Sequence, residues 1–213
     1  MTSKDITLYY FGINGKAILP RFILNQAKVE FTNKTYTFED WGKESVNHEY
    51  NQLPQLTIGG KVFSQSLAIA QYLAKKYNPE LLGKTDDEQY EVHNFLLSVE
   101  DLGGSIFPIY KNQDPSKKQE LLNIAIEELK RFVVVWEKKY TASGAGKYYI
   151  GDYLTLVDVT LDYFLQLFTV VIPDLEKTFT ELAPNLNKII LANRETGAIK
   201  EFRESQYFNQ KTV

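Results

Sequence analysis

The hydrophobic periodicity of the chain changes once, near Asn78-Pro79, and this change constrains the fold more than any other feature. Before it, strand-like runs such as Ile6–Tyr10 alternate with helix-like stretches such as Ala17–Lys28. After it, apolar residues recur only at helical spacing, for example from Val92 to Ile106. The sequence therefore predicts an α/β domain followed by an all-helical domain.

The first part of the chain has the element order βαβ-ββα. A second strand is expected within residues 30–38, and the Gly59-Gly60 pair between two strand-like runs indicates a hairpin that closes the sheet. A helix over residues 64–77 then ends at Asn78-Pro79. The expected domains are an α/β domain at residues 1–78, a linker at 79–85 and a helical domain at 86–213.

Charge and cysteine content exclude several kinds of function. With 24 Lys and Arg against 27 Asp and Glu, the net charge of −3 supplies no positive field to hold a nucleic acid. The chain has no cysteine, which excludes disulfides, thiolate metal sites and nucleophilic catalysis by a protein thiol. If a thiol reacts at this protein, it belongs to the substrate.

The sequence carries no clear targeting or metal-binding signal. Its start lacks the long apolar stretch of a signal peptide, and the most apolar later stretch, 163–172, is about half of the roughly 20 residues that span a bilayer. His48 and His93 have no partners at metal-ligand spacing. We expect a cytoplasmic protein that binds neither a membrane nor a metal ion.

Several short motifs follow one another in both parts of the chain. They are Tyr10-Phe11 at the end of the first strand, Trp41, Gln52-Leu53-Pro54 before the third strand, Ser64-Gln65-Ser66 at a helix start, Val99–Leu102 and Gly151–Asp158. In this order and at these separations, the set resembles the cytosolic glutathione transferases of the tyrosine type, closest to the sigma, pi and mu classes, with sigma favoured. The resemblance implies a thioredoxin-like first domain and glutathione as co-substrate.

The resemblance also implies that Tyr10 is the catalytic residue. A free thiol with a pKa near 8.5 is only about 3% thiolate at pH 7, and lowering its pKa by about two requires about 2.7 kcal/mol. One hydrogen bond from a neutral hydroxyl to a charged acceptor contributes roughly 1.5–3 kcal/mol, so a single tyrosine can supply most of this energy. Because strand residues alternate, Tyr9 points to the opposite face and is expected to be structural.

The resemblance further implies a glutathione site around a cis Leu53–Pro54 bond. The Leu53 backbone would pair with the cysteinyl part of glutathione, and a helix capped by Ser66, with Gln65 in its first turn, would take the γ-glutamyl carboxylate. The indole of Trp41 would bind the glycine end. The expected glutathione-binding residues are Phe11, Lys16, Trp41, Lys43, Gln52, Leu53, Pro54, Gln65, Ser66 and Asp101.

The chain departs from the family pattern in the first helix and after the tryptophan. Lys16 and Ile18 stand where the family has an arginine and a glutamate, so a planar fork is replaced by a point charge. Ser45 stands where the family has a lysine, and Lys43 lies two residues early. Which of Lys16, Lys43 and Ser45 serves the glycine carboxylate stays open.

A second substrate and a second subunit are also implied by the resemblance. In these classes the acidic residue at Asp101 reaches the glutathione of the neighbouring subunit, so we expect a homodimer, and Tyr50 falls where the pi class inserts an aromatic key. Thr155 and Asp158 are expected to cap a core helix. The expected electrophile pocket comprises Ile13, Phe107, Tyr110 and Phe208.

The expected activity is conjugation of glutathione to hydrophobic electrophiles, with reduction of organic hydroperoxides left open. Two alternatives stay open. The exchanges at Lys16, Ile18 and Ser45 also fit a non-catalytic, crystallin-like relative that binds glutathione or another ligand. The other alternative is a prostaglandin D synthase-like isomerase, against which Leu97 and Pro108 stand where those enzymes place an acid and a tryptophan.

Overall fold

The computed structural model describes residues 5–169, 171–172 and 174–208. The chain divides into two compact units, one made of Met1–Leu81 with Thr196–Val213 and the other of Leu82–Glu195. The sequence predicts one helical domain from residue 86 to the end. The structure differs, because α9 (Gly197–Glu204) packs against α1 (Ile18–Gln26) of the first unit.

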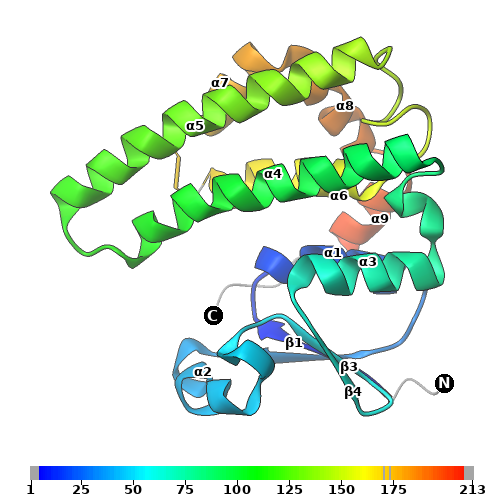
Figure 1. Cartoon of the computed structure of the whole chain (residues 1–213), viewed down its shortest axis with the longest axis vertical. Coiled ribbons are helices and arrows are strands. Elements are labelled where there is room, and N and C mark those ends of the chain that lie inside the picture. Colours follow the sequence, from blue (N-terminus) through cyan, green and yellow to red (C-terminus); the bar gives the residue numbers. More distant parts are fainter. Residues whose placement is uncertain (1–4, 170, 173, 209–213) are drawn as a thin grey trace. The chain divides into compact units, whose positions relative to one another are not determined.

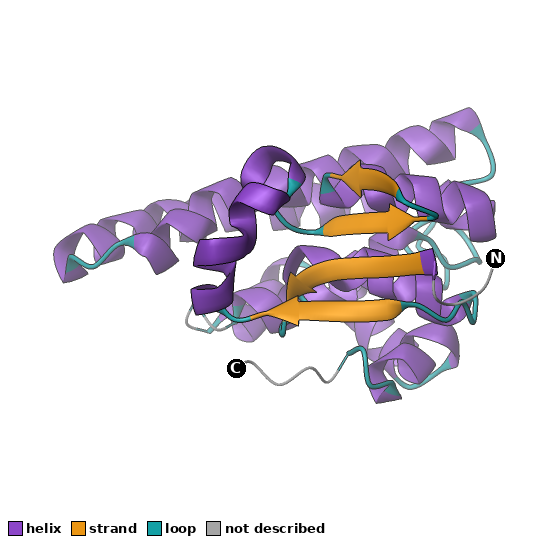
Figure 2. Ribbon diagram, turned by 90° about the horizontal axis from the view of Figure 1, so that it is seen from below, coloured by secondary structure: helices purple, strands orange, loops and turns teal. Residues whose placement is uncertain are grey.

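The first unit contains a four-stranded mixed sheet in the order β2-β1-β3-β4 (Figure 2). β2 runs parallel to β1, whereas β3 and β4 form an antiparallel hairpin beside β1. This arrangement confirms the predicted thioredoxin-like βαβ-ββα fold. The strands are β1 (Ile6–Phe11), β2 (Thr32–Tyr36), β3 (Gln55–Ile58) and β4 (Lys61–Ser64).

Helices α1 and α3 (Ser66–Tyr77) pack together beside the sheet (Figure 1). Each helix has an apolar face with fully buried side chains, among them Phe22 on α1 and Leu73 on α3. Short 3₁₀ helices at Gly15–Ala17, Ser45–Asn47, Glu49–Asn51 and Pro79–Leu82 complete the connections.

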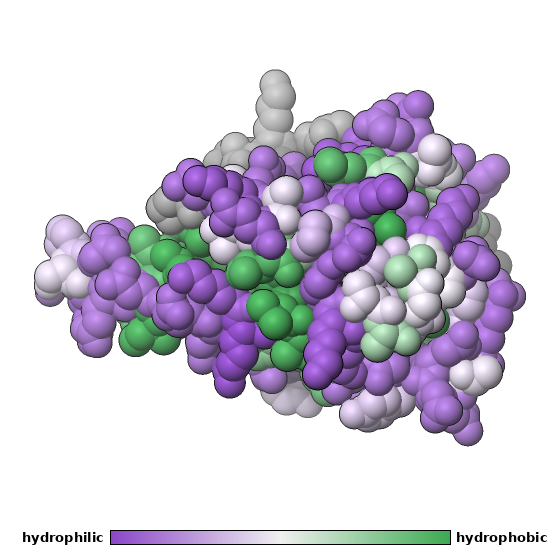
Figure 3. All heavy atoms as spheres, turned by 90° about the horizontal axis from the view of Figure 1, so that it is seen from above, coloured by the Kyte–Doolittle hydropathy of each residue, from purple (hydrophilic) through white to green (hydrophobic). Residues whose placement is uncertain are grey.

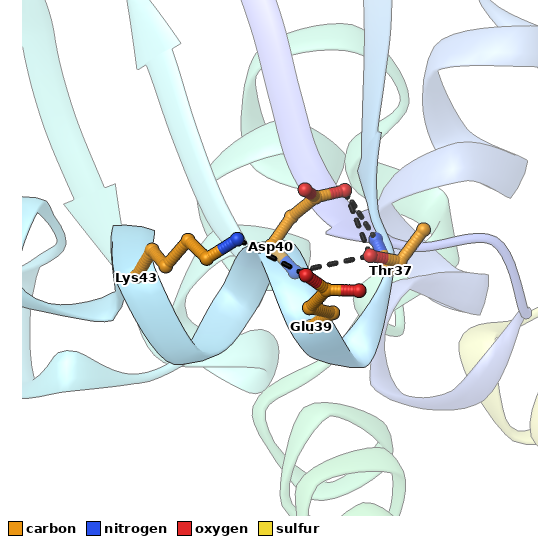
Figure 4. Close-up of polar contacts among 4 residues, drawn as sticks. All are labelled: Thr37, Glu39, Asp40 and Lys43. Carbon is orange, nitrogen blue, oxygen red and sulfur yellow. Dashed lines mark hydrogen bonds and ion pairs between the residues drawn. The ribbon is translucent and has the colours of Figure 1, made fainter.

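A further helix, α2 (Phe38–Glu44), lies between β2 and β3 and was missed by the hydrophobic pattern. None of its side chains is buried, so it has no apolar stripe to reveal it. Its signal is a capping box: the Asp40 N–H donates to Thr37 Oγ1 at 3.0 Å, and Thr37 N–H donates to Asp40 Oδ2 at 3.4 Å (Figure 4). The Thr37 hydroxyl, which donates to Asp40 Oδ2 at 2.7 Å, and the Thr37 N–H together hold the pKa of the Asp40 carboxyl below its usual range.

Alternation along β1 decides which face each tyrosine occupies. Tyr10 is buried on the same face as Ile6 and Leu8. Tyr9 faces the other way, and its ring lies 6.4 Å from that of Tyr36. Of the two tyrosines, Tyr10 is therefore the one whose hydroxyl reaches the loop before α1.

The second unit is helical throughout its described elements. Its longest helices, α4 and α5, pack along each other, and Val92, Phe95 and Trp136 are buried between them and their neighbours. Within the described residues, no helix is long and apolar enough to cross a membrane. The helices are α4 (Asp86–Lys111), α5 (Pro115–Ala142), α6 (Leu156–Phe168), α7 (Leu175–Leu182) and α8 (Pro184–Arg194).

α5 leaves apolar side chains on the surface of this unit. Ile124, Val134 and Val135 are each about half exposed. Figure 3 shows green hydrophobic side chains between purple hydrophilic ones on the face that it draws.

The predicted cap of α6 is confirmed. Asp158 is buried, and its carboxylate accepts the N–H of Tyr149 at 2.7 Å and the N–H of Thr155 at 2.8 Å. Burial raises the pKa of Asp158 to about 6, although these hydrogen bonds act in the opposite direction. The cap therefore holds an acidic group whose ionisation is coupled to the packing of the second unit.

Candidate active site

Tyr10 lies near the end of β1, with its hydroxyl turned toward the first turn of the next helical segment. The hydroxyl oxygen accepts the backbone N–H of Lys16 at 2.9 Å. The guanidinium carbon of Arg21 lies 5.7 Å from the centre of the tyrosine ring. Because a hydroxyl that accepts a hydrogen bond becomes a stronger donor, this arrangement prepares Tyr10 to stabilise an anion.

Gly15 permits the close approach of the loop to Tyr10. Its φ of +40° lies in the left-handed region, and a Cβ at this position would overlap the tyrosine hydroxyl. The next peptide N–H, that of Lys16, is thereby brought to hydrogen-bonding distance of the hydroxyl. The donor is a backbone group, so the exchange of the family arginine for Lys16 does not remove it.

Arg21 is a residue of this site that the sequence analysis missed. It is fully buried on α1, and its guanidinium donates to the carbonyl oxygens of Phe11 at 3.2 Å and Ile13 at 2.5 Å, and to Asn33 Oδ1 at 3.1 Å. A buried cation is stable only with such acceptors. Its sequence signal is an arginine next to Phe22 in an otherwise apolar helix face.

A polar cavity of about 200 Å³ lies beside the cis Leu53–Pro54 bond. It brings together six of the expected glutathione-binding residues, along with Tyr50 and Ser64. Amide, hydroxyl and ammonium groups dominate this lining, which suits a polar ligand with carboxylates. The lining residues are Lys16, Tyr50, Gln52, Leu53, Pro54, Ser64, Gln65 and Ser66.

The helix entry at this cavity differs by one residue from the prediction. Ser66 was expected as the N-cap, but the N-cap is Gln65, with a φ of +70°, and Ser66 is the first residue of α3. Gln65 Nε2 donates to Gln52 Oε1 at 3.5 Å, the outer limit of a hydrogen bond. The backbone N–H groups that begin α3 consequently open at the cavity.

Trp41 and Lys43 lie on α2, outside the lining of this cavity. The half-buried Trp41 ring packs 6.0 Å from Phe11 and 5.2 Å from His48. Burial lowers the pKa of His48, which keeps this aromatic cluster uncharged at neutral pH. Lys43 is exposed and forms an ion pair with Glu39 at 3.1 Å (Figure 4).

A smaller cavity of about 70 Å³ lies next to Phe11 and Ile13. Its other walls come from Gly12, from the end of β2 and from the start of α2, residues 35–38, so it belongs entirely to the first unit. Of the residues expected in the electrophile pocket, Ile13 is the one that lines it. The wall is largely apolar, as expected for a surface beside a hydrophobic substrate.

Phe208 does not form an open wall. Its side chain is buried, with its ring 5.6 Å from that of Phe202, and its carbonyl oxygen accepts Asn14 Nδ2 at 2.6 Å. This aromatic ring packs in the core of the first unit, and its expected place in the electrophile pocket stays a prediction. An aromatic residue near a chain end gives no sequence signal of which surface it covers.

The remaining expected residues belong to the second unit. Phe107 is partly exposed and lines an open cavity of about 350 Å³ with Gly104, Pro108 and Asn112. Asp101 is exposed on α4. The side chain of Tyr110 lies outside the described residues. Among the described residues, no three His, Cys, Asp or Glu side chains are grouped as metal ligands would be.

The sheet topology of the first unit and the helical second unit together define the class of cytosolic glutathione transferases. Two family models match the chain: "Glutathione S-transferase, N-terminal domain" over residues 6–75 and "Glutathione S-transferase, C-terminal domain" over residues 100–206. The chain belongs to the glutathione S-transferase family. The family resemblance inferred from the motifs is thereby confirmed.

Individual relatives agree with this assignment. The class-mu 28 kDa glutathione S-transferase isozyme of Schistosoma japonicum is 32% identical over 192 residues, which cover 86% of this chain and 88% of that one. The hematopoietic prostaglandin D synthase of Rattus norvegicus is 28% identical, with 85% of this chain and 88% of that protein covered. The solved structure of the Ascaris lumbricoides glutathione S-transferase has a TM-score of 0.78 and 28% identity, covering 93% of this chain and 96% of that one.

Proposed function

We propose that this glutathione transferase holds the sulfur of glutathione as a thiolate through the Tyr10 hydroxyl and transfers it to hydrophobic electrophiles. The observation that carries the proposal is the hydrogen bond from the Lys16 N–H to the Tyr10 hydroxyl. The hydroxyl donates to the thiolate, which attacks an electrophilic carbon and forms a carbon–sulfur bond while the leaving group departs. The protein needs no thiol of its own, in keeping with a chain without cysteine.

Glutathione is proposed to bind in the polar cavity beside the cis-proline. The Leu53 backbone pairs with the cysteinyl part of the peptide, as one strand pairs with another. The N–H groups at Ser66 and the Gln65 side chain take the γ-glutamyl carboxylate, supported by the positive end of the α3 dipole. Lys16 lines the same cavity and is the proposed partner of the glycine carboxylate. Trp41 and Lys43 stay predicted contacts at the glycine end.

Assembly and location complete the proposal. The protein is proposed to act in the cytoplasm as a symmetric homodimer, in which Asp101 of one subunit reaches the γ-glutamyl ammonium bound by the other. Tyr50 is 68% exposed with a left-handed φ of 58°, which supports a role as an aromatic contact to the neighbouring subunit.

Steady-state kinetics with a generic aryl halide test this function, using Tyr9 as a matched control. Tyr10→Phe removes only the hydroxyl and should lower kcat/KM by about 10- to 100-fold, because the lost hydrogen bond to an anion contributes roughly 1.5–3 kcal/mol. Tyr9→Phe, on the opposite face of β1, should retain most of the activity. Equal activity of the wild type and Tyr10→Phe would refute the proposed role.

The two alternative functions, a crystallin-like relative and an isomerase, would give different results in this assay. A non-catalytic relative would bind glutathione without conjugating it. A prostaglandin D synthase-like enzyme would isomerise an endoperoxide, and the relationship to the rat synthase makes that substrate a useful second assay. Conjugation that depends on Tyr10, without endoperoxide turnover, is the result expected here.

A further inference from the structure

The end of the chain returns to the first unit and packs beside the elements that carry Tyr10. α9 lies next to α1 (Figure 1), and the Phe202 ring lies 5.3 Å from that of Phe22. Beyond α9, the ring of Tyr207 stacks on that of Phe31 at 4.7 Å. The segment 197–208 is therefore held by aromatic contacts along its length.

The last described residue of this segment, Phe208, is joined by a buried hydrogen bond to the loop that follows β1. Asn14 Nδ2 donates to the Phe208 carbonyl oxygen at 2.6 Å, and both residues are buried. A buried amide without an acceptor costs about 1–3 kcal/mol, so this contact fixes the side chain of Asn14. It links positions separated by 194 residues in the sequence.

Asn14 in turn belongs to the loop that presents the Lys16 N–H to Tyr10. The Asn14 carbonyl oxygen accepts the N–H of Ala17 at 2.9 Å, which closes the turn around Lys16. On its other side, Asn14 Oδ1 lies 3.5 Å from Nη1 of Arg21, the buried arginine that holds the loop carbonyls. The loop thus has one anchor on α1 and one on the C-terminal segment.

We propose that Asn14 and the C-terminal segment are positioning elements for catalysis, because their contact holds the Lys16 N–H against the Tyr10 hydroxyl. The inference rests on the proposed role of Tyr10 in stabilising the thiolate. Asn14 acts through the loop and does not itself meet the sulfur. When the anchor is lost, the Lys16 N–H leaves its hydrogen-bonding position more often, Tyr10 becomes a weaker donor, and the pKa of bound glutathione rises.

Two variants remove the hydrogen bond between Asn14 and Phe208, one by changing the donor and the other by removing the acceptor. Asn14→Leu keeps the branched shape of the side chain and adds no charge, but it cannot donate to the Phe208 carbonyl. A chain that ends at Gln206 keeps Asn14 and lacks that carbonyl. The matched control is Asn193→Leu in the second unit, where a buried asparagine also donates from Nδ2 to a backbone carbonyl, that of Lys147 at 3.4 Å.

The measurement is the pH dependence of thiolate absorbance for glutathione bound to each variant, with thermal unfolding recorded in parallel. Asn14→Leu and the shortened chain should each reduce the thiolate fraction below neutral pH by about tenfold, which corresponds to a rise of about one in the pKa. KM for glutathione should change little. Because both variants break the same contact, the rise in the double variant should be smaller than the sum of the two single rises. Asn193→Leu should leave the pKa unchanged.

An unchanged pKa in both Asn14→Leu and the shortened chain would overturn the inference, even if both variants unfold at lower temperature. Additive effects in the double variant would also overturn it, because two independent perturbations would then be at work. The Tyr10→Phe variant separates this failure from failure of the proposed function. If Tyr10→Phe also leaves the pKa unchanged, the role of Tyr10 itself is wrong.

Discussion

At the scale of single residues, the site depends on how closely one loop approaches one hydroxyl. Gly15 has no side chain where a Cβ would overlap Tyr10, and its left-handed φ is one that other residues rarely adopt. The adjacent peptide N–H supplies a hydrogen bond without any contribution from the Lys16 side chain. A substitution at Lys16 can therefore remove its ammonium group while the backbone N–H that binds Tyr10 stays in place.

Gly15→Ala is expected to lower kcat/KM by about tenfold or more, because the new methyl group must displace the Tyr10 hydroxyl or the loop. Gly42→Ala is the matched control, since nothing lies within 4 Å of a Cβ built there. That change should leave kinetics unaltered and raise the free energy of unfolding by about 0.5–1 kcal/mol, because alanine favours a helix. Steady-state kinetics of Gly15→Ala matching the wild type would contradict this prediction.

Replacing two lysines separates the candidates for the glycine carboxylate. Lys16→Ala should raise KM for glutathione about tenfold, equivalent to about 1.4 kcal/mol, while kcat stays near that of the wild type because the backbone N–H is retained. Lys43→Ala should change KM by less than about twofold, since Lys43 is exposed and already pairs with Glu39. Initial-rate kinetics over a range of glutathione concentrations measure both; the opposite ranking would assign the carboxylate to Lys43.

At the scale of elements, the sequence predicted those helices and strands that have a regular hydrophobic pattern better than the elements that lack one. The order of strands and helices in the first unit followed from changes of period, whereas the cis Leu53–Pro54 bond was predicted only through the family resemblance. α2 was missed because it buries no side chain. The cap of α3 was misplaced by one residue because Gln65 adopts a left-handed φ, which sequence preferences for helix caps do not anticipate.

The cap of α6 makes a prediction about pH. Because burial raises the pKa of Asp158 from its ordinary 3.8 to about 6, the folded state favours the protonated acid. The contribution of Asp158 to stability is therefore fully present below about pH 4 and is lost as pH rises through about 6, a change of about 3 kcal/mol. Denaturant unfolding of wild type and Asp158→Asn across this range should show the wild type losing stability relative to the variant. Parallel curves would contradict the raised pKa.

At the scale of the whole molecule, residues distant in sequence form one compact unit. The sequence predicted a single boundary near residues 79–85, but the first unit also takes in the segment after Glu195. Phe208 and Arg21 show why the sequence did not predict that the segment after Glu195 belongs to the first unit. Whether an aromatic ring or an arginine is buried depends on acceptors and surfaces supplied by other elements, which local periodicity does not encode. Motifs spread over the whole chain nevertheless identified the family.

The proposed homodimer gives a prediction at this scale. Asp101→Asn should raise KM for glutathione about tenfold with little change in kcat, because the partner subunit would lose a charged contact to the γ-glutamyl ammonium. Sedimentation should show the mass of two chains for wild type and variant alike. A monomer that conjugates glutathione at the same rate would contradict the role of Asp101.

The most direct test of the account is the pKa of the thiol in the protein–glutathione complex, measured from thiolate absorbance for the wild type and for Tyr10→Phe. We expect a pKa of about 6.5 in the wild type against about 8.5 for a free thiol, and a return toward the free value, with loss of aryl halide conjugation, in Tyr10→Phe. Glutathione bound with an unshifted pKa and without turnover would contradict it, and a ligand-binding relative of the family would then be the better description.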